Sequence, residues 1–223
     1  MFARPALTGD VKVEIWSDVV CPWCYIGKRR FEDALARFEH RDEVEVVWRS
    51  FELDPSAPRD GSSLDLTAHL ARKYGVSLEQ AEAMHARVTQ VAADEGLEYR
   101  LDLARRGSSF DAHRLVHAAA GAGLQDAMKE RLLRAYFTEG VLLSDHDELR
   151  RLAAEVGVDA SFLDDPTEPY ADAVRADVEE ARALEVSGVP FFAVDRRFGI
   201  AGAQDADTVL LVLQRAWAAR DAA

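Results

Sequence analysis

Cysteine is scarce in this sequence: its 223 residues include only two, at positions 21 and 24. Two cysteines cannot form the disulfide framework of a small secreted domain, and no second pair is present to complete a zinc site. No apolar run is long enough to span a membrane. Basic residues are also few, with 27 Lys and Arg against 40 Asp and Glu and a net charge of −13. Because phosphate binding requires basic patches, we expect neither nucleic acid nor a membrane as a partner.

The remaining composition is that of a globular protein, with 48% hydrophobic and 30% charged residues. A chain of this length holds one large domain, or one domain with a substantial insertion. Residues 1–9 lack the apolar core of a signal peptide, so the sequence predicts a cytoplasmic location. In a reducing compartment, two cysteines this close together are typical of a catalytic disulfide.

The two cysteines lie in the motif Cys21-Pro22-Trp23-Cys24, between a strand pattern and a helix pattern. Apolar residues alternate over residues 11–16, as in a half-buried strand. After the motif they recur at spacings of three and four, as on one face of a helix. Pro22 is favoured at the first helical position, which makes Cys21 the N-cap. The helix dipole and the free N–H groups of the first turn should then favour the Cys21 thiolate.

We therefore expect Cys21 to be an exposed nucleophile of low pKa. Cys24 begins the apolar stripe, so it should be the shielded sulfur that resolves a mixed disulfide on Cys21. A zinc half-site is a weaker interpretation, because two further ligands would be needed. A structural disulfide is also weaker, because so small a loop would constrain the unfolded chain little. The pattern favours thiol–disulfide exchange.

The pattern of strands and helices predicts an α/β fold in two separated halves. A second strand pattern over residues 44–51 completes a βαβ unit with parallel strands and a right-handed crossover. Near the C-terminus, apolar runs at 191–194 and 198–201 flank a polar turn, which indicates an antiparallel hairpin. An apolar helical face follows. Together the βαβ and ββα halves form a thioredoxin-like fold.

Residues 63–186, between the two halves, carry helical patterns almost throughout. Ser77 and Ser144 each precede an apolar run with capping-box spacing, so both are expected to be N-caps. The last of these helices is expected from about residue 168 to 186. The fold prediction is thus a thioredoxin-like domain of residues 10–56 and 187–223, with a large all-helical insertion domain of residues 57–186.

Several separated motifs resemble the DsbA-family thiol–disulfide oxidoreductases of the FrnE-like branch. They occur in the family's order, and the resemblance covers almost the whole chain after about residue 10. The motifs are residues 17–27, 48–53, 110–115, 188–192 and 200–204. The resemblance implies a thioredoxin fold with a helical insertion, a redox-active Cys21–Cys24 pair, and a cis peptide bond at Pro190 that faces the pair.

Hydroxychromene-carboxylate isomerases and kappa-class glutathione transferases resemble this fold too. In those enzymes a serine typically replaces the first cysteine and activates glutathione. Cys21 at this position favours disulfide exchange instead. The expected partners are thiol or disulfide substrates, either proteins or glutathione. No bound cofactor is expected, and the sequence does not indicate an oligomeric state. Two alternatives remain: a glutathione-dependent isomerase or transferase acting on a small aromatic substrate, and a redox-responsive chaperone-like binding protein.

Four residues beside the cysteines are candidates for the site. Pro190, in the cis form, would leave the backbone of Val189 free to pair with an extended substrate segment. Trp23 is expected to be exposed and to offer an apolar contact. His113 is expected to be a polar group near the active cleft or a helix-capping partner.

Other polar residues have simpler interpretations. Asp18 is expected to accept hydrogen bonds from nearby backbone N–H groups rather than to relay a proton to Cys24. Lys28 shares the Cys24 face of the helix and is expected to be solvated. His113 and His117 have helical spacing, but two histidines alone leave a metal site incomplete, so no metal is expected.

Overall fold

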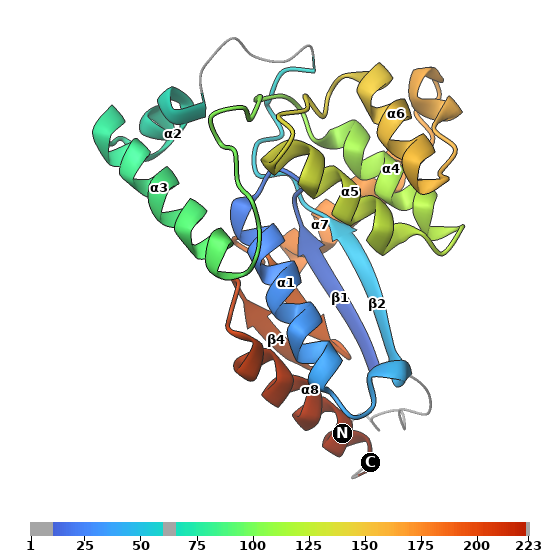
Figure 1. The fold of residues 1–223 in the computed structure, drawn as a ribbon. Helices are drawn as coiled ribbons and strands as arrows, with labels where there is room; N and C mark the ends of the chain where they lie inside the picture. The colour runs from blue at the N-terminus through green and yellow to red at the C-terminus, as the bar shows by residue number, and fades with distance from the viewer. Residues whose placement is uncertain (1–10, 60–65, 222–223) are drawn as a thin grey trace.

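The computed structural model describes residues 11–59 and 66–221, which form a four-stranded sheet covered by helices. The strand order is β2-β1-β3-β4, and Figure 1 shows the two long strands at its centre and edge. β1 pairs in parallel with β2 and antiparallel with β3, which in turn pairs antiparallel with β4. The strands are β1 (Val11–Ser17), β2 (Val44–Ser50), β3 (Phe191–Val194) and β4 (Phe198–Ala201). The predicted thioredoxin-like order of βαβ and ββα halves is confirmed.

Helices cover both faces of the sheet. α1 (Pro22–Arg37) and α8 (Ala206–Asp221) pack together on one face, and α7 (Ala171–Ala183) lies behind the other. β1 is buried on both sides because it is a central strand between two helical layers. The core on the α1 side includes Phe31 and Phe192, whose rings stack at 5.7 Å.

The segment between β2 and β3 is helical, and none of its described residues joins the sheet. In Figure 1 the first two of its helices lie on one side of α1, and α4, α5 and α6 lie on the other. The helices are α2 (Leu66–Tyr74), α3 (Leu78–Asp94), α4 (Phe110–Ala120), α5 (Gln125–Phe137), α6 (His146–Val156) and α7, with a 3-10 turn at Ser161–Asp164. The prediction of an all-helical segment between the two halves is therefore confirmed over its described residues.

The helix ends confirm one capping prediction, correct another, and correct the start of one helix. Ser77 forms the expected capping box with Gln80. The prediction of Ser144 as a cap is wrong, because Asp145 is the N-cap and its carboxylate accepts the N–H groups of residues 147 and 148. The helix expected from residue 168 begins only at Ala171, because Tyr170 before it has a positive φ of 66° and cannot continue a helix backwards.

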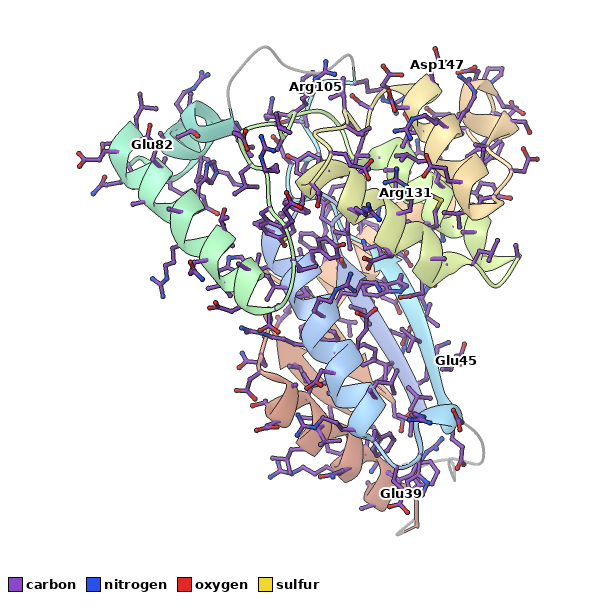
Figure 2. The ribbon with its side chains drawn as sticks, in the orientation of Figure 1. Glu39, Glu45, Glu82, Arg105, Arg131 and Asp147 are labelled. Atoms are coloured by element: carbon purple, nitrogen blue, oxygen red, sulfur yellow. The ribbon has the colours of Figure 1, made fainter. Side chains whose placement is uncertain are left out.

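The division of the chain into domains stays a prediction. The expectation about export, which rests on residues 1–9, lies outside the described residues. Over residues 11–59 and 66–221, no helix combines the length and the apolar character that a membrane crossing requires. Figure 2 shows charged side chains such as Glu39, Glu82 and Asp147 at the outer edges of the fold. Charged groups that are buried are therefore exceptions that need a physical reason.

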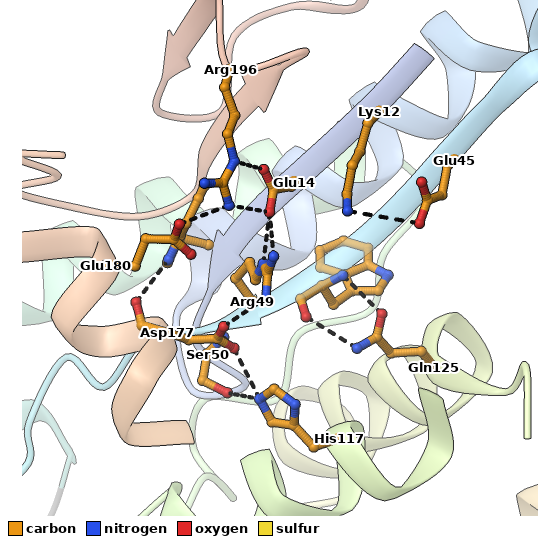
Figure 3. Close-up of polar contacts among 12 residues, drawn as sticks. Lys12, Glu14, Glu45, Arg49, Ser50, His117, Gln125, Asp177, Glu180 and Arg196 are labelled. Carbon is orange, nitrogen blue, oxygen red and sulfur yellow. Dashed lines mark hydrogen bonds and ion pairs between the residues drawn. The ribbon is translucent and has the colours of Figure 1, made fainter. Parts of the chain in front are cut away.

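One such group, Glu14, ties together the face of the sheet that α7 covers. Its carboxylate in β1 accepts from Arg49 Nε of β2 at 3.0 Å and from Arg196 of the β3–β4 turn, as Figure 3 shows. Arg49 also bonds Asp177 of α7 at 3.0 Å. Burial raises the pKa of Glu14, but the two guanidinium groups outweigh it and hold the pKa at about 2. His117 pairs with Asp177 at 2.9 Å at the end of this network.

Candidate active site

The Cys-X-X-Cys motif begins α1 as the sequence predicts. Cys21 is the N-cap, with φ −92° and ψ 116°, and Pro22 is the first helical residue. One expectation is wrong: within the described residues, the Cys21 sulfur accepts no capping hydrogen bond. The first-turn N–H of Cys24 instead donates to the main-chain oxygen of Cys21 at 3.0 Å. The backbone therefore closes the first turn without the sulfur.

Cys21 is also less exposed than predicted. Both cysteines are reduced in the structure, and their exposed fractions are 3% for Cys21 and 1% for Cys24. The loop before β3 covers Cys21, because its Sγ lies 3.6 Å from the carbonyl oxygen of Val189. Trp23, between them, is exposed at 41% as expected. Long-range packing, invisible in the local pattern, shields the first cysteine.

The loop over Cys21 is held by a close contact with α1. The Val189–Pro190 peptide bond is cis, as the sequence predicts. The Pro190 ring lies so close to Gly27 of α1 that a Cβ added there would lie 2.8 Å from Pro190 Cγ. The carbonyl oxygen of Pro190 accepts from Gly202 N at 2.8 Å. Glycine at position 27 thus lets the loop approach the helix that carries both cysteines.

A cavity of about 890 Å³ opens beside the motif. Cys21, Pro22 and Trp23 line it, whereas Cys24 does not. Its apolar wall comes mostly from the helical segment, and its other wall from the loops after β2 and before β3. The lining includes Phe51, Glu52, Leu53, Leu66, Leu70, Lys73, Tyr74, Met84, Arg87, Val88, Leu101, Arg106, Tyr136, Phe137, Ser187, Gly188 and Val189. Of the two sulfurs, only that of Cys21 can meet a ligand in this cavity.

The two thiols are electrostatically coupled, and the distribution of charge differs from the prediction. The hydrogen bond with Cys24, together with burial, raises the pKa of Cys21. Burial raises the pKa of Cys24 as well, but the Cys21 thiol, the Lys129 ammonium and the Ser17 hydroxyl outweigh it and lower that pKa. The surroundings therefore favour Cys24 over Cys21 as the site of the first thiolate of the pair. Attack from Cys21 requires the proton of Cys21 to move across to Cys24.

Asp18 and His113 form a buried pair beneath the motif. His113 Nε2 lies 3.2 Å from Asp18 Oδ1, and both side chains are almost fully buried. The other oxygen of Asp18 accepts from Leu53 N at 2.8 Å, so the expectation of backbone bonds is confirmed. Burial lowers the pKa of His113, and the neutral ring can donate to the ionised Asp18. His113 contacts the site through Asp18 and does not cap a helix.

Two residues that the sequence did not single out, Tyr99 and Lys129, complete the surroundings. Tyr99 Oη donates to the carbonyl oxygen of Pro22 at 2.6 Å, and its ring stacks on Phe137 at 4.6 Å. Lys129 of α5 is buried behind the pair, where its Nζ donates to Ser17 O at 3.1 Å. Burial lowers the pKa of Lys129 to about 8. In the sequence, the only sign that Lys129 is buried was its place on the apolar face of a helix.

The expectation of a solvated Lys28 is wrong. This lysine is 1% exposed, because α5 packs over it and supplies Asp126 and Glu130 at 3.2 and 3.1 Å. The histidines with helical spacing also separate, since His113 binds Asp18 and His117 binds Asp177. Among the described residues, no group of three or more potential ligands could hold a metal ion.

Comparison with known proteins identifies the family. The model of the DSBA-like thioredoxin domain matches residues 12–214. This chain belongs to that family. It is also 46% identical to a probable DsbA oxidoreductase from Streptomyces coelicolor, with a TM-score of 0.87 over 93% of this chain and 90% of that one. The family resemblance found in the sequence motifs is confirmed, and the DSBA-like chain is a thiol–disulfide oxidoreductase.

Two further relatives of the DSBA-like chain are more distant. The uncharacterized protein YwbO of Bacillus subtilis is 29% identical over 196 residues, which are 82% of this chain and 86% of that protein. The cytosolic disulfide reductase DsbM from Pseudomonas aeruginosa, solved with GSH, is 21% identical with a TM-score of 0.64 and covers 92% of this chain and 98% of its own. At that identity the likeness to DsbM shows the shared fold.

Proposed function

We propose that this chain is a cytoplasmic thiol–disulfide oxidoreductase in which Cys21 forms the mixed disulfide and Cys24 resolves it. The observation that carries this assignment is that Cys21 lines the 890 Å³ cavity whereas Cys24 does not. A substrate sulfur can therefore approach Cys21 directly. Cys24 can reach that sulfur only through Cys21, which is the geometry of a resolving cysteine.

The exchange follows from this arrangement in two steps. The Cys21 thiolate attacks one sulfur of a substrate disulfide, forms a mixed disulfide and releases the other half as a thiolate. Cys24 then loses its proton and attacks the Cys21 sulfur, which leaves the Cys21–Cys24 disulfide and releases the second half, and this half takes up the proton. Two electrons pass from the pair to the substrate, and the reverse sequence oxidises two substrate thiols. Val189, whose carbonyl oxygen lies 3.6 Å from Cys21, offers its main chain to an extended substrate.

We infer further that small peptide thiols such as glutathione are redox partners. The volume of the cavity suits a small molecule. Lys73 of α2 and Arg87 of α3 line it, and neither has an ion pair within the described part of the chain. In a protein with a net charge of −13, two cations at one cavity that form no ion pair among the described residues favour a ligand with carboxylates. The structure of DsbM with GSH gives a structural neighbour that binds such a ligand.

The test is equilibration of the purified protein against glutathione buffers of defined redox state. The Cys24→Ser variant should accumulate one glutathione per chain, detected by mass spectrometry, and Cys21→Ser should accumulate none. If the wild-type pair neither oxidises nor reduces in these buffers and Cys24→Ser forms no adduct with oxidised glutathione or with an unfolded protein that carries a disulfide, the proposed function is wrong.

A further inference from the structure

Two buried lysines lie near the same tryptophan ring, and they differ in how their charge is balanced. The Nζ atoms of Lys28 and Lys129 lie 5.9 and 5.5 Å from the centroid of the Trp48 ring. Both side chains are 1% exposed. Lys28 is surrounded by carboxylates, with Asp126 at 3.2 Å, Glu130 at 3.1 Å and Glu32 also paired. Its positive charge is fully compensated.

Lys129 has no such compensation. Its Nζ donates to the main-chain oxygen of Ser17 at 3.1 Å. Within residues 11–59 and 66–221, no carboxylate lies within ion-pair distance of it. An ammonium group that is buried without a counter-charge costs several kcal/mol, and proteins retain such groups where a partner charge appears nearby. A partner charge for Lys129 is therefore expected among the groups packed against it.

The groups that face Lys129 come from four elements. The end of β1 contributes Asp18, whose oxygens already bind His113 and the N–H of Leu53. β2 contributes the apolar ring of Trp48, and α4 contributes His113, which burial keeps neutral. α1 contributes the compensated Lys28 and the redox pair, which begins four residues after Ser17, the residue whose oxygen Lys129 binds. The charges of Cys24 and Cys21 both raise the pKa of Lys129. Among the described groups that face Lys129, the thiolate is the negative charge that is present in the reduced state and absent in the oxidised one.

We propose that Lys129 is the counter-ion of the reduced Cys21–Cys24 pair, and that it sets the reduction potential by stabilising the thiolate from behind. This inference rests on the proposed function and adds to it a positioning residue that the helical segment contributes. Because the thiolate exists only in the reduced pair, the ammonium stabilises the reduced state. Lys129 should therefore make the pair more oxidising.

The charge balance also links electron transfer to a proton. The reduced site holds one thiolate, one thiol and the Lys129 ammonium. When the pair transfers two electrons to a disulfide, the first substrate half leaves as a thiolate and carries the negative charge away. In the resolving step the proton of Cys24 passes to the second half, which leaves as a thiol. The ammonium is then buried beside a neutral disulfide, which favours its release of a proton. Burial already lowers the pKa of Lys129 to about 8, so this release falls within an accessible pH range.

The experiment compares Lys129→Met with Lys129→Arg and with Lys28→Met. Methionine fills the buried volume without a charge, and an apolar replacement of a buried ion is often tolerated. Lys28→Met is the matched control, because it removes an equally buried lysine that faces carboxylates instead of sulfur. The equilibrium constant of each variant is measured against glutathione buffers, together with the pH dependence of cysteine alkylation.

We expect Lys129→Met to favour the oxidised form about tenfold over wild type, which corresponds to about 30 mV for a two-electron couple. Its alkylation profile should move to higher pH, whereas Lys129→Arg and Lys28→Met should stay close to wild type. Equal potentials and equal alkylation profiles for Lys129→Met and Lys28→Met would overturn the inference. A wild-type protein that does not equilibrate with glutathione would instead overturn the glutathione proposal, and the alkylation profiles would still decide the role of Lys129.

A second measurement needs no loss of the lysine. NMR titration of the Lys129 side chain, assigned by comparison with Lys129→Arg, should show its ammonium losing its proton at lower pH in the oxidised than in the reduced protein. Identical titrations in the two redox states would contradict the coupling even if Lys129→Met failed to fold.

Discussion

The Cys21 Sγ lies 3.6 Å from the carbonyl oxygen of Val189, although 168 residues separate the two in the chain. The same oxygen belongs to the main-chain segment that lines the cavity beside the motif. In the reduced protein the Cys21 thiol can donate to this oxygen. When Cys21 enters a disulfide it has no proton to donate, and the Val189 oxygen becomes free to accept from a substrate. Formation of a mixed disulfide on Cys21 thus frees the Val189 oxygen to bind the main chain of the same substrate.

The roles of the two cysteines lead to a first prediction. In Cys24→Ser the mixed disulfide on Cys21 cannot be resolved, so adducts should persist after the oxidant is removed. Cys21→Ser should abolish exchange, because Cys24 does not line the cavity. Mass spectrometry after incubation with a disulfide measures both. Persistent adducts on Cys24 in the Cys21→Ser variant would reverse the assignment.

The contact between Gly27 and Pro190 leads to a second prediction. A Cβ at position 27 would lie 2.8 Å from Pro190 Cγ, so Gly27→Ala must displace the loop over Cys21. Overpacking of this kind costs about 1–3 kcal/mol, against a gain of about 1 kcal/mol from replacing a helical glycine. Gly27→Ala should be less stable than wild type in urea unfolding and should exchange disulfides more slowly.

Gly121→Ala is the control for that variant. Gly121 ends α4 with φ −63°, and the nearest atom to an added Cβ is 3.9 Å away. It should be as stable as wild type or more so. Equal stability and equal exchange rates for the two alanine variants would show that the Pro190 loop does not depend on the glycine.

The buried carboxylate of Glu14 leads to a third prediction. Its pKa is about 2 in the fold against an ordinary 4.5, so its stabilisation is fully present above about pH 4.5 and is lost as the pH falls toward 2. Glu14→Gln should lower the stability near neutral pH by roughly 1–3 kcal/mol, because hydrogen bonds to charged groups contribute on that scale. Its stability should also change less than that of wild type between pH 4.5 and 2.

Figure 3 also shows the control, Glu45, whose contact with Lys12 is exposed and 3.9 Å long. Glu45→Gln should leave both the stability and its acid dependence unchanged, since exposed ion pairs contribute little. Denaturant unfolding at several pH values tests both variants. Parallel pH profiles for Glu14→Gln and wild type would contradict the account.

The cations at the cavity lead to a fourth prediction. Reversing both charges in Lys73→Glu/Arg87→Glu should raise KM for glutathione several-fold with little change in kcat, because binding is weakened before any chemistry. A neutral thiol such as 2-mercaptoethanol should be used as well as before. Arg182→Glu, an exposed change on α7, controls for the added negative charge. An equal rise in KM for both thiols would argue against carboxylate recognition.

The strand and the helix around the two cysteines could be predicted from the sequence. Contacts between residues that are distant in the chain could not. Pro22 after Cys21 sets the N-terminus of α1, and the alternation in β1 sets the strand before it, so both appear in the pattern. The exposure of Cys21 could not be predicted, because the covering atom belongs to Val189, which is distant in the chain. Family resemblance supplied the cis form of Pro190, which spacing alone does not indicate.

The burial of Lys28 and Lys129 could not be predicted from the sequence either. Lys28 has the sequence environment of a surface lysine, and only the packing of α5 over it reveals Asp126 and Glu130 as partners. Lys129 is hidden for the same reason, because its neighbours come from β1, β2 and α1. Asp145 displaced Ser144 as a cap because adjacent residues with similar side chains compete for the same N–H groups.

The position of Trp48 has a spectroscopic consequence. Its indole Nε1 donates to Asp126 at 3.0 Å, and the two lysine ammonium groups lie within 6 Å of its ring. An indole in so strong a local field emits at a wavelength that depends on the charges around it. In a background that removes the fluorescence of Trp16, Trp23 and Trp217, the colour of the light emitted by Trp48 should report whether the buried site is charged, in real time and without a chemical label.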